Sequence, residues 1–220
     1  MSTSEPLILG FDTSAAHCAA ALLSGDRVLA TAHEDMGKGQ AERLMPLLAE
    51  VIEAGGAAPG DLDAIGVGIG PGNFTGIRIS VAAARGLALA LGIPAVGVST
   101  LEARCHGLPR PITVIEDARR SEVYVQAFDG AGAGTPRLLV TSDLPHTIAT
   151  PRVTGSGAAE AAGVIPGLTV LAPAMPLAEA IARIAAARRL DPDLPRPAPL
   201  YIRAADAAPS RDAGPVILPS

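Results

Sequence analysis

The sequence predicts an α/β fold made of two related halves. Along the first hundred residues, short apolar segments of strand length alternate with segments of helical periodicity. A strand that ends near an aspartate and leads into a hairpin occurs once in each half, at Asp12 and at Asp117. The periodicity breaks near residues 100–108. We therefore expect an N-terminal domain of residues 1–104 and a C-terminal domain of residues 105–220.

The first half is predicted to hold strands, two long helices and a short one. The expected strands are Leu7–Phe11, Cys18–Leu23, Arg27–Glu34, Ala64–Ile69 and Ala95–Val98, and the long helices are Ala41–Ala54 and Thr75–Leu91. Gly55-Gly56 ends the first long helix, and Gly92 with Pro94 ends the second. Ser99 is placed to cap a short helix.

The second half repeats this pattern of strands and helices. The expected strands are Ile112–Ile115, Glu122–Phe128, Arg137–Val140 and Arg152–Gly155. Helix Leu177–Arg189 is expected to bury Ala178, Ile181, Ile184 and Ala185, and a proline-rich extended tail follows from Asp191. An aspartate hairpin in each half is the layout of the actin/sugar-kinase/Hsp70 superfold, which consists of two ribonuclease H-like halves. The sequence resembles that fold.

The composition argues against a protein that binds RNA by itself. The formal net charge is −5, and aromatic residues make up 2% of the chain. RNA-binding proteins usually carry a basic surface and aromatic side chains for base stacking. Charged residues make up only 18%, so the surface has room for apolar contacts with partner proteins.

The sequence also predicts a cytoplasmic protein without a membrane segment. Cys18 and Cys105 show no metal-ligand spacing and are expected to be reduced core thiols. The N-terminal segment has no basic residue and is not a signal peptide. Arg78 and Arg85 interrupt the best candidate for a membrane span, so we expect none.

The most specific segment is the loop Gly70-Pro71-Gly72-Asn73-Phe74-Thr75-Gly76-Ile77-Arg78. Pro71-Gly72 predicts a tight turn, and Thr75 is placed to cap the helix that follows. Backbone N–H groups at such a helix start could bind an anion. The alternative is a strand-to-helix turn without a ligand. It is not a nucleotide-binding P-loop, because the Lys-Ser/Thr pair is absent.

This loop resembles the GPGSFTGxR signature of the TsaB (YeaZ) family. Leu9–Ser14 resembles the family's opening LAIDTS, and Gly97–Leu101 its GVSTL. Asp117-Ala118-Arg119 with Glu122-Val123-Tyr124 resembles DARxxEVY, and Pro199–Arg203 resembles the closing PxYLR. The matches follow the family's order and cover residues 7–203.

The resemblance implies a non-catalytic subunit of the bacterial complex that makes N6-threonylcarbamoyladenosine at position 37 of tRNA. It implies a TsaD-like catalytic paralogue and a TsaE-like P-loop ATPase as partners, a possible homodimer, and contact with tRNA only through the complex. TsaD binds a metal through two histidines one helical turn apart. Gln40 and Leu44 stand at those positions here, so the resemblance implies no metal, no cofactor and no catalytic residue.

Two enzyme classes are alternatives to this interpretation. A metallopeptidase is disfavoured because His17, His33, His106 and His146 lack zinc-peptidase spacing, and we expect His17 and His33 on a hairpin surface. An active kinase or ATPase of the same superfold would use Asp12 and Asp117 to hold magnesium beside glycine-rich turns. Asp12-Thr13-Ser14-Ala15-Ala16-His17 contains no glycine, so Asp12 is interpreted as a turn former. Nucleotide binding by the isolated chain would favour this alternative.

The helix Thr75–Leu91 is apolar nearly all round. Ile77, Val81, Ala84, Ala88 and Leu91 share the side expected to face the sheet. Its outer side would meet water unless something covers it. We therefore predict a docking face for a TsaD-like partner or a second copy, formed by Met45, Ile52, Arg78, Arg85 and Leu89. The alternative is that the two long helices cover each other and the second domain covers the rest.

Overall fold

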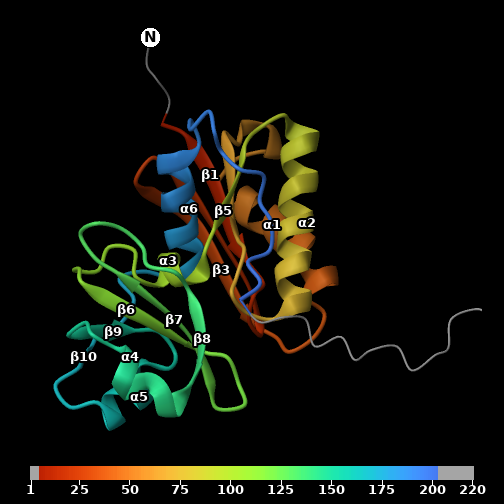
Figure 1. Cartoon of the computed structure of the whole chain (residues 1–220). Coiled ribbons are helices and arrows are strands. Elements are labelled where there is room, and N and C mark those ends of the chain that lie inside the picture. Colours follow the sequence, from red (N-terminus) through yellow and green to blue (C-terminus); the bar gives the residue numbers. More distant parts are fainter. Residues whose placement is uncertain (1–4, 203–220) are drawn as a thin grey trace, which may run out of the picture.

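The protein consists of two lobes, each built on a five-stranded mixed sheet (Figure 1). The computed structural model describes residues 5–202 of the 220. The strands of the first sheet are β1 (Leu7–Asp12), β2 (His17–Ser24), β3 (Arg27–Asp35), β4 (Ala64–Gly68) and β5 (Ala95–Val98). Their order is β3-β2-β1-β4-β5. The β1–β2 and β2–β3 pairs are antiparallel, and the β1–β4 and β4–β5 pairs are parallel.

The second sheet repeats this topology. Its strands are β6 (Ile112–Asp117), β7 (Glu122–Phe128), β8 (Arg137–Val140), β9 (Arg152–Thr154) and β10 (Thr169–Val170), in the order β10-β9-β6-β7-β8. The first three strands are again antiparallel neighbours, and the last two are parallel to the first. The prediction of an α/β fold with two related halves is therefore confirmed.

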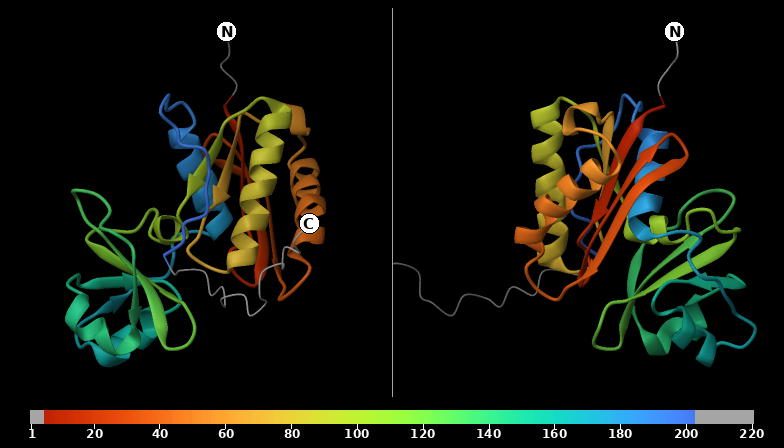
Figure 2. Two further views of the ribbon diagram at one scale, coloured as in Figure 1. Left: turned by 45° about the vertical axis from the view of Figure 1, so that its right-hand side comes forward. Right: turned by 180° about the vertical axis from the view of Figure 1, so that it is seen from behind.

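Three long helices cover the first sheet on both faces. Helices α1 (Gln40–Ala54) and α2 (Phe74–Leu91) lie on one face, and α6 (Leu177–Arg188) lies on the other (Figure 2). Alternate residues of β1 point to opposite faces, so Leu9 and Phe11 join the core under α1 while Ile8 joins the core with Ile181. The four residues predicted for the inner face of α6 are all buried.

Helix α6 returns from the second half of the chain to the first lobe. The division at residues 104/105 stays a prediction, and the structure adds that α6 packs against β1 and β4 of the first sheet. Small residues allow the close approach. A Cβ atom built on Gly10 would lie 2.5 Å from the carbonyl oxygen of Ala178 and 2.7 Å from the Cβ of Ala182. Gly66 similarly faces Ala185 and the backbone of Ile181.

The remaining helical elements are short. Helix α3 (Thr100–Arg104) links the two sheets, and α4 (Leu144–Thr147) and α5 (Ala158–Val164) belong to the second lobe. Two 3₁₀ turns, η1 and η2, occupy Pro59–Asp61 and Thr141–Asp143. The sequence prediction did not include α4, α5, β10 or the two 3₁₀ turns. The predicted proline-rich tail is described as far as Ile202, and the rest of it lies outside the described residues.

One of the two predicted helix caps is wrong. Asn73, and not Thr75, caps α2: its Oδ1 accepts the backbone N–H groups of Thr75 (2.9 Å) and Gly76 (3.1 Å). An Asn side chain reaches these groups because it precedes the first turn. Ser99 occupies the N-cap position of α3 as predicted, although its hydroxyl makes no capping hydrogen bond.

The prediction that no segment could span a membrane also needs correction. Helix α2 has 18 residues and a mean hydropathy of 1.4, which qualifies by length and composition alone despite Arg78 and Arg85. The same composition suits a helix packed on a sheet. Ile77, Val81 and Ala84 are indeed buried on the inner side of α2.

Candidate functional site

A cleft of about 990 Å³ lies between the two lobes. Its first-lobe wall comes from the loop after β1 and from the glycine-rich loop before α2. Its second-lobe wall comes from the β6–β7 turn, Tyr124 and Ser156, and the chain's last described residues, Leu200–Ile202, also line it. Pockets of this volume accommodate small molecules. The cleft is therefore the first place to look for a site.

Asp12 closes the first hairpin from inside the protein. It is fully buried, and its Oδ1 accepts hydrogen bonds from the backbone N–H of Ser14 (2.9 Å) and the hydroxyl of Ser14 (2.8 Å). The Nε2 of His17 lies 2.8 Å from the same oxygen. The interpretation of Asp12 as a turn former is confirmed. The prediction that His17 lies on the surface is wrong, because this contact holds its ring inside; His33 is exposed as expected.

Sequence reasoning missed that Asp12, Ser14 and His17 come together. Their geometry is not that of a hydrolase triad. In a triad the histidine takes the proton of the serine and the aspartate orients the histidine. Here the serine hydroxyl and the imidazole both contact one carboxylate oxygen, so the serine points at the aspartate. The arrangement stabilises a turn and gives no activated nucleophile.

The glycine-rich loop is clamped to this hairpin and to α3. The backbone N–H of Asn73 donates to the carbonyl of Ser14 (2.6 Å), and the Thr13 hydroxyl donates to the carbonyl of Gly76 (2.7 Å). A Cβ atom on Gly72 or Gly76 would collide with the carbonyl oxygens of Ser14 and Thr13, respectively. These glycines are therefore required for close backbone approach.

This geometry favours the ligand-free turn over an anion site. The helix-start N–H groups of Thr75 and Gly76 already donate to Asn73. A second anchor comes from Thr100, whose N–H donates to the carbonyl of Gly70 (2.9 Å) and whose hydroxyl donates to the carbonyl of Pro71 (3.0 Å). The loop is thus held on both sides by protein groups.

The second hairpin resembles the first. Asp117 Oδ1 accepts the backbone N–H of Arg119 (2.8 Å), which closes a turn in which Arg119, Arg120 and Ser121 all have positive φ (63°, 55° and 58°). Such backbone is costly for residues other than glycine. As at the first hairpin, the aspartate stabilises the turn, and the turn contains no glycine to approach a phosphate closely.

Glu116 joins the second hairpin to α3. Its Oε2 accepts the hydroxyl of Ser156 (3.0 Å), and its Oε1 lies 3.1 Å from the Nε of Arg104. Ser156 in turn accepts the backbone N–H of Asp117 (2.8 Å). The acidic groups of the cleft wall are therefore engaged in holding the two lobes and the turn.

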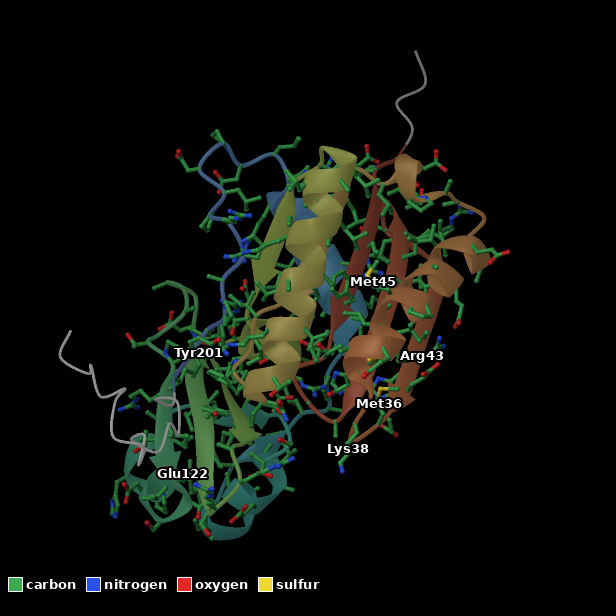
Figure 3. All side chains as sticks on the ribbon, turned by 90° about the vertical axis from the view of Figure 1, so that its right-hand side faces the viewer. Met36, Lys38, Arg43, Met45, Glu122 and Tyr201 are labelled. Atoms are coloured by element: carbon green, nitrogen blue, oxygen red, sulfur yellow. The ribbon has the colours of Figure 1, made fainter. Side chains whose placement is uncertain are left out.

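An arginine lies beside two neighbouring aromatic rings at the cleft. The guanidinium of Arg78 lies 3.7 Å from the ring centroid of Phe74 and 5.8 Å from that of Tyr201. Its Nε donates to the hydroxyl of Tyr201 (2.8 Å), and the two ring centroids are 5.0 Å apart. Figure 3 shows Tyr201 beside α2. The sequence placed Phe74 and Arg78 in one motif and Tyr201 in another, but gave no sign that the two motifs meet.

The positions implied for metal ligands serve the core instead. Gln40 Nε2 donates to the carbonyls of Ala15 (2.6 Å) and His17 (3.3 Å), and Leu44 is buried among the core residues of the first lobe. Cys18 and Cys105 are free and buried, as expected. Burial raises the pKa of the Cys18 thiol, and it raises the pKa of Cys105 to about 11.

The predicted docking residues divide into exposed and buried ones. Leu89 is 83% exposed and Met45 46% exposed. Arg78 is exposed and Arg85 half-buried. Ile52 is only 5% exposed, so its place on the docking face is wrong: it points into the core under α1. Sequence reasoning missed the exposed small residues Ala82, Gly86 and Ala90, which run along the outer side of α2.

A charge network borders this face on α1. Arg43 donates to both Glu34 (2.6 and 2.8 Å) and Glu50 (2.6 and 2.7 Å). These hydrogen bonds hold the pKa values of the two carboxyls below their usual range. Figure 3 shows Arg43 and Met45 on the same side of the molecule as α2. The apolar face is thus flanked by an ordered polar edge.

Comparison with known proteins finds similar sequences and a matching family model. The family model "TsaD: tRNA N6-adenosine threonylcarbamoyltransferase" matches residues 32–134. The chain is 36% identical over 124 residues to the Escherichia coli tRNA threonylcarbamoyladenosine biosynthesis protein TsaB. That match covers 53% of this chain and 52% of the relative, so it spans about half of the E. coli protein. An uncharacterised Mycobacterium tuberculosis protein is 34% identical, with 84% of this chain and 82% of the relative covered.

A solved structure extends the likeness to nearly the whole chain. YeaZ from Pseudomonas aeruginosa matches with a TM-score of 0.71 and 28% identity, over 89% of this chain and 99% of that one. This likeness and the duplicated sheet topology confirm the predicted actin/sugar-kinase/Hsp70-like fold. The chain belongs to the TsaB (YeaZ) family.

Proposed function

We propose that this protein is a cytoplasmic, non-catalytic subunit of the complex that makes N6-threonylcarbamoyladenosine at position 37 of tRNA. Its role is to dock onto and support a TsaD-like catalytic paralogue. The observation that carries the docking role is the outer face of α2, where Leu89 stands 83% exposed beside a run of small residues. Exposed apolar patches on a soluble protein are typical of interaction sites.

The chemistry of the chain supports a non-catalytic role. Gln40 and Leu44 have structural contacts where the catalytic paralogue would have metal ligands. Both hairpin aspartates close turns. The proposal therefore assigns the transfer reaction to the partner, ATP hydrolysis to a TsaE-like P-loop protein, and tRNA contact to the assembled complex. A homodimer through the same helices is the state expected when the partner is absent.

The proposal is tested by reconstitution. The three proteins from one genome are purified and supplied with tRNA, ATP and an activated threonylcarbamoyl donor, and threonylcarbamoyladenosine formation is measured with each protein left out in turn. We expect co-elution of this chain with the TsaD-like protein, full activity only in the complete mixture, and no metal at one ion per chain in this subunit. Undiminished activity without this chain, or ATP hydrolysis by this chain alone, would contradict the proposal and favour the kinase or ATPase alternative.

A further inference from the structure

Arg78 lies beside the neighbouring rings of Phe74 and Tyr201 and is held in one orientation with its charge exposed. Stacking on Phe74 at 3.7 Å fixes the plane of the guanidinium, and the hydrogen bond from Nε to Tyr201 fixes its rotation within that plane. The two terminal nitrogens donate to no residue among 5–202 and remain as parallel donors. A guanidinium presented in this way matches a carboxylate or phosphate with two hydrogen bonds.

No acidic side chain among residues 5–202 pairs with Arg78. Four of the described arginines, at 43, 104, 183 and 188, each form an ion pair with a glutamate. The cation is thus oriented by two aromatic rings and a hydroxyl, and none of these supplies a countercharge. The guanidinium is therefore open to an anion that lies outside the described residues.

The position of Arg78 indicates where that anion comes from. Residues 78, 82 and 89 lie within about 40° of one another around α2, because each residue advances a helix by about 100°. Arg78 therefore shares the outer face of α2 with Ala82 and Leu89, at the end nearest the cleft. Tyrosine and arginine are also the residues most enriched among the energetically dominant contacts of protein interfaces.

We infer that Arg78, Phe74 and Tyr201 form a preorganised fork for an acidic side chain of the partner protein that docks on α2. The inference rests on the proposed function and specifies one contact of that interface. It also gives a joint role to the glycine-rich motif and the closing motif, whose residues 78 and 201 meet across 123 positions of sequence.

An RNA phosphate is the competing anion, and the overall charge of the chain disfavours it. The formal net charge is −5, although the cleft itself is mixed in charge, with Glu116 and Asp117 beside Arg104 and Arg119. A phosphate backbone brings many negative charges close to this surface, whereas a single carboxylate brings one. The described chain also offers no second aromatic platform, since its other exposed large apolar residues are aliphatic.

The test compares variants of the full chain for affinity to the purified TsaD-like partner by titration calorimetry. Arg78→Gln is expected to weaken binding about tenfold or more, because it removes a hydrogen-bonded charge at an interface. Arg78→Lys is expected to restore part of that loss, since lysine keeps the charge without the fork. Tyr201→Phe keeps the ring but loses the acceptor for Nε, and a few-fold loss is expected. Each variant's fold is checked by thermal unfolding.

Arg27→Gln is the matched control. It removes the same charge at the turn between β2 and β3, where Arg27 stands opposite Ser24 in the strand pair. This turn lies at the end of the first sheet that is away from the cleft. Equal affinity losses for Arg78→Gln and Arg27→Gln would overturn the inference. If Arg78→Gln leaves partner affinity unchanged but weakens tRNA binding by the assembled complex, the fork holds a phosphate and the inference is also overturned, while the proposed function stands.

A charge-reversal screen supplies the positive identification. Arg78→Glu is combined with partner variants in which surface aspartates and glutamates are changed to arginine one at a time. Recovery of affinity for one combination identifies the carboxylate that the fork holds. If neither Arg78→Gln nor Leu89→Glu affects pairing, the partner does not dock on α2, and both the inference and the docking part of the proposed function fail.

Discussion

Single residues explain why the motif loop is rich in glycine. Gly72 and Gly76 bring the loop against carbonyl groups of the Asp12 hairpin, and Asn73 caps the following helix. The sequence correctly predicted a turn at this loop and a turn at Asp12. It could not predict the burial of His17. Nearly all of β2 is buried on both faces, so the strand shows no alternation that would assign its first residue to a side.

Close packing of α6 on β1 leads to a stability prediction for Gly10→Ala. The new Cβ would meet the backbone oxygen of Ala178 and the Cβ of Ala182, and backbone cannot move aside cheaply. We expect a loss of about 1–3 kcal/mol in the free energy of unfolding, measured by urea titration. Gly86→Ala is the control. It has no atom within 4 Å of the new Cβ and should gain up to about 1 kcal/mol from helix propensity. Equal stability of the two variants would show that α6 does not pack as described.

His106 gives a prediction on pH dependence. Burial lowers its pKa from the ordinary value of 6.5, against a smaller raising effect of Glu102. Below about pH 6.5 the unfolded chain therefore binds more protons than the folded one, and stability falls as the pH falls. We expect the free energy of unfolding to drop between pH 7 and pH 5 with a contribution of at most about 1.4 kcal/mol per pH unit. His106→Gln should remove that contribution, and an unchanged slope in urea titrations of this variant would contradict the assignment.

Among the elements, long and periodic segments were predicted well and short ones were not. Helix α6 was predicted with its buried face, because its apolar residues recur at helical spacing. The sheet that α6 covers could not be predicted. An amphipathic pattern indicates which face of a helix is buried, but it does not indicate which element that face packs against. The two-residue strand β10 and the four-residue helix α4 carry too few residues to show a period. Ile52 was predicted to lie on the exposed docking face, although it belongs to the row of buried apolar residues on the inner side of α1.

The outer face of α2 gives a prediction on pairing. Leu89→Glu places a charge where the proposed interface would desolvate it, so pairing with the TsaD-like partner should be lost while the monomer stays folded. Met45→Glu should act in the same way. Val164→Glu is the matched control, because Val164 is a 55% exposed apolar residue on a helix of the second lobe. Size-exclusion co-elution and thermal unfolding measure both effects. Co-elution of folded Leu89→Glu with the partner would place the interface elsewhere.

At the scale of the whole molecule, duplication explains the cleft and its chemistry. Two sheets of the same topology bring one aspartate hairpin each to the space between them. The sequence predicted the duplication from those two aspartates. It could not show that the last described residues return to the first lobe, where Leu200 N–H donates to the carbonyl of Ile69 (2.8 Å). Contacts between motifs far apart in sequence carry no local signal, and this is why the Arg78 site was missed.

Net charge and aromatic placement together predict weak binding of tRNA by the isolated protein. Affinity for RNA comes largely from cations that displace counterions, and this chain has a net charge of −5. Base stacking on Tyr201 and Phe74 is hindered because the two rings already hold Arg78. We expect a dissociation constant no tighter than the micromolar range at about 150 mM salt, measured by fluorescence anisotropy with labelled tRNA. The same titration with the TsaD-like partner present should bind more tightly. A nanomolar dissociation constant for the isolated chain would show that this subunit recognises tRNA directly.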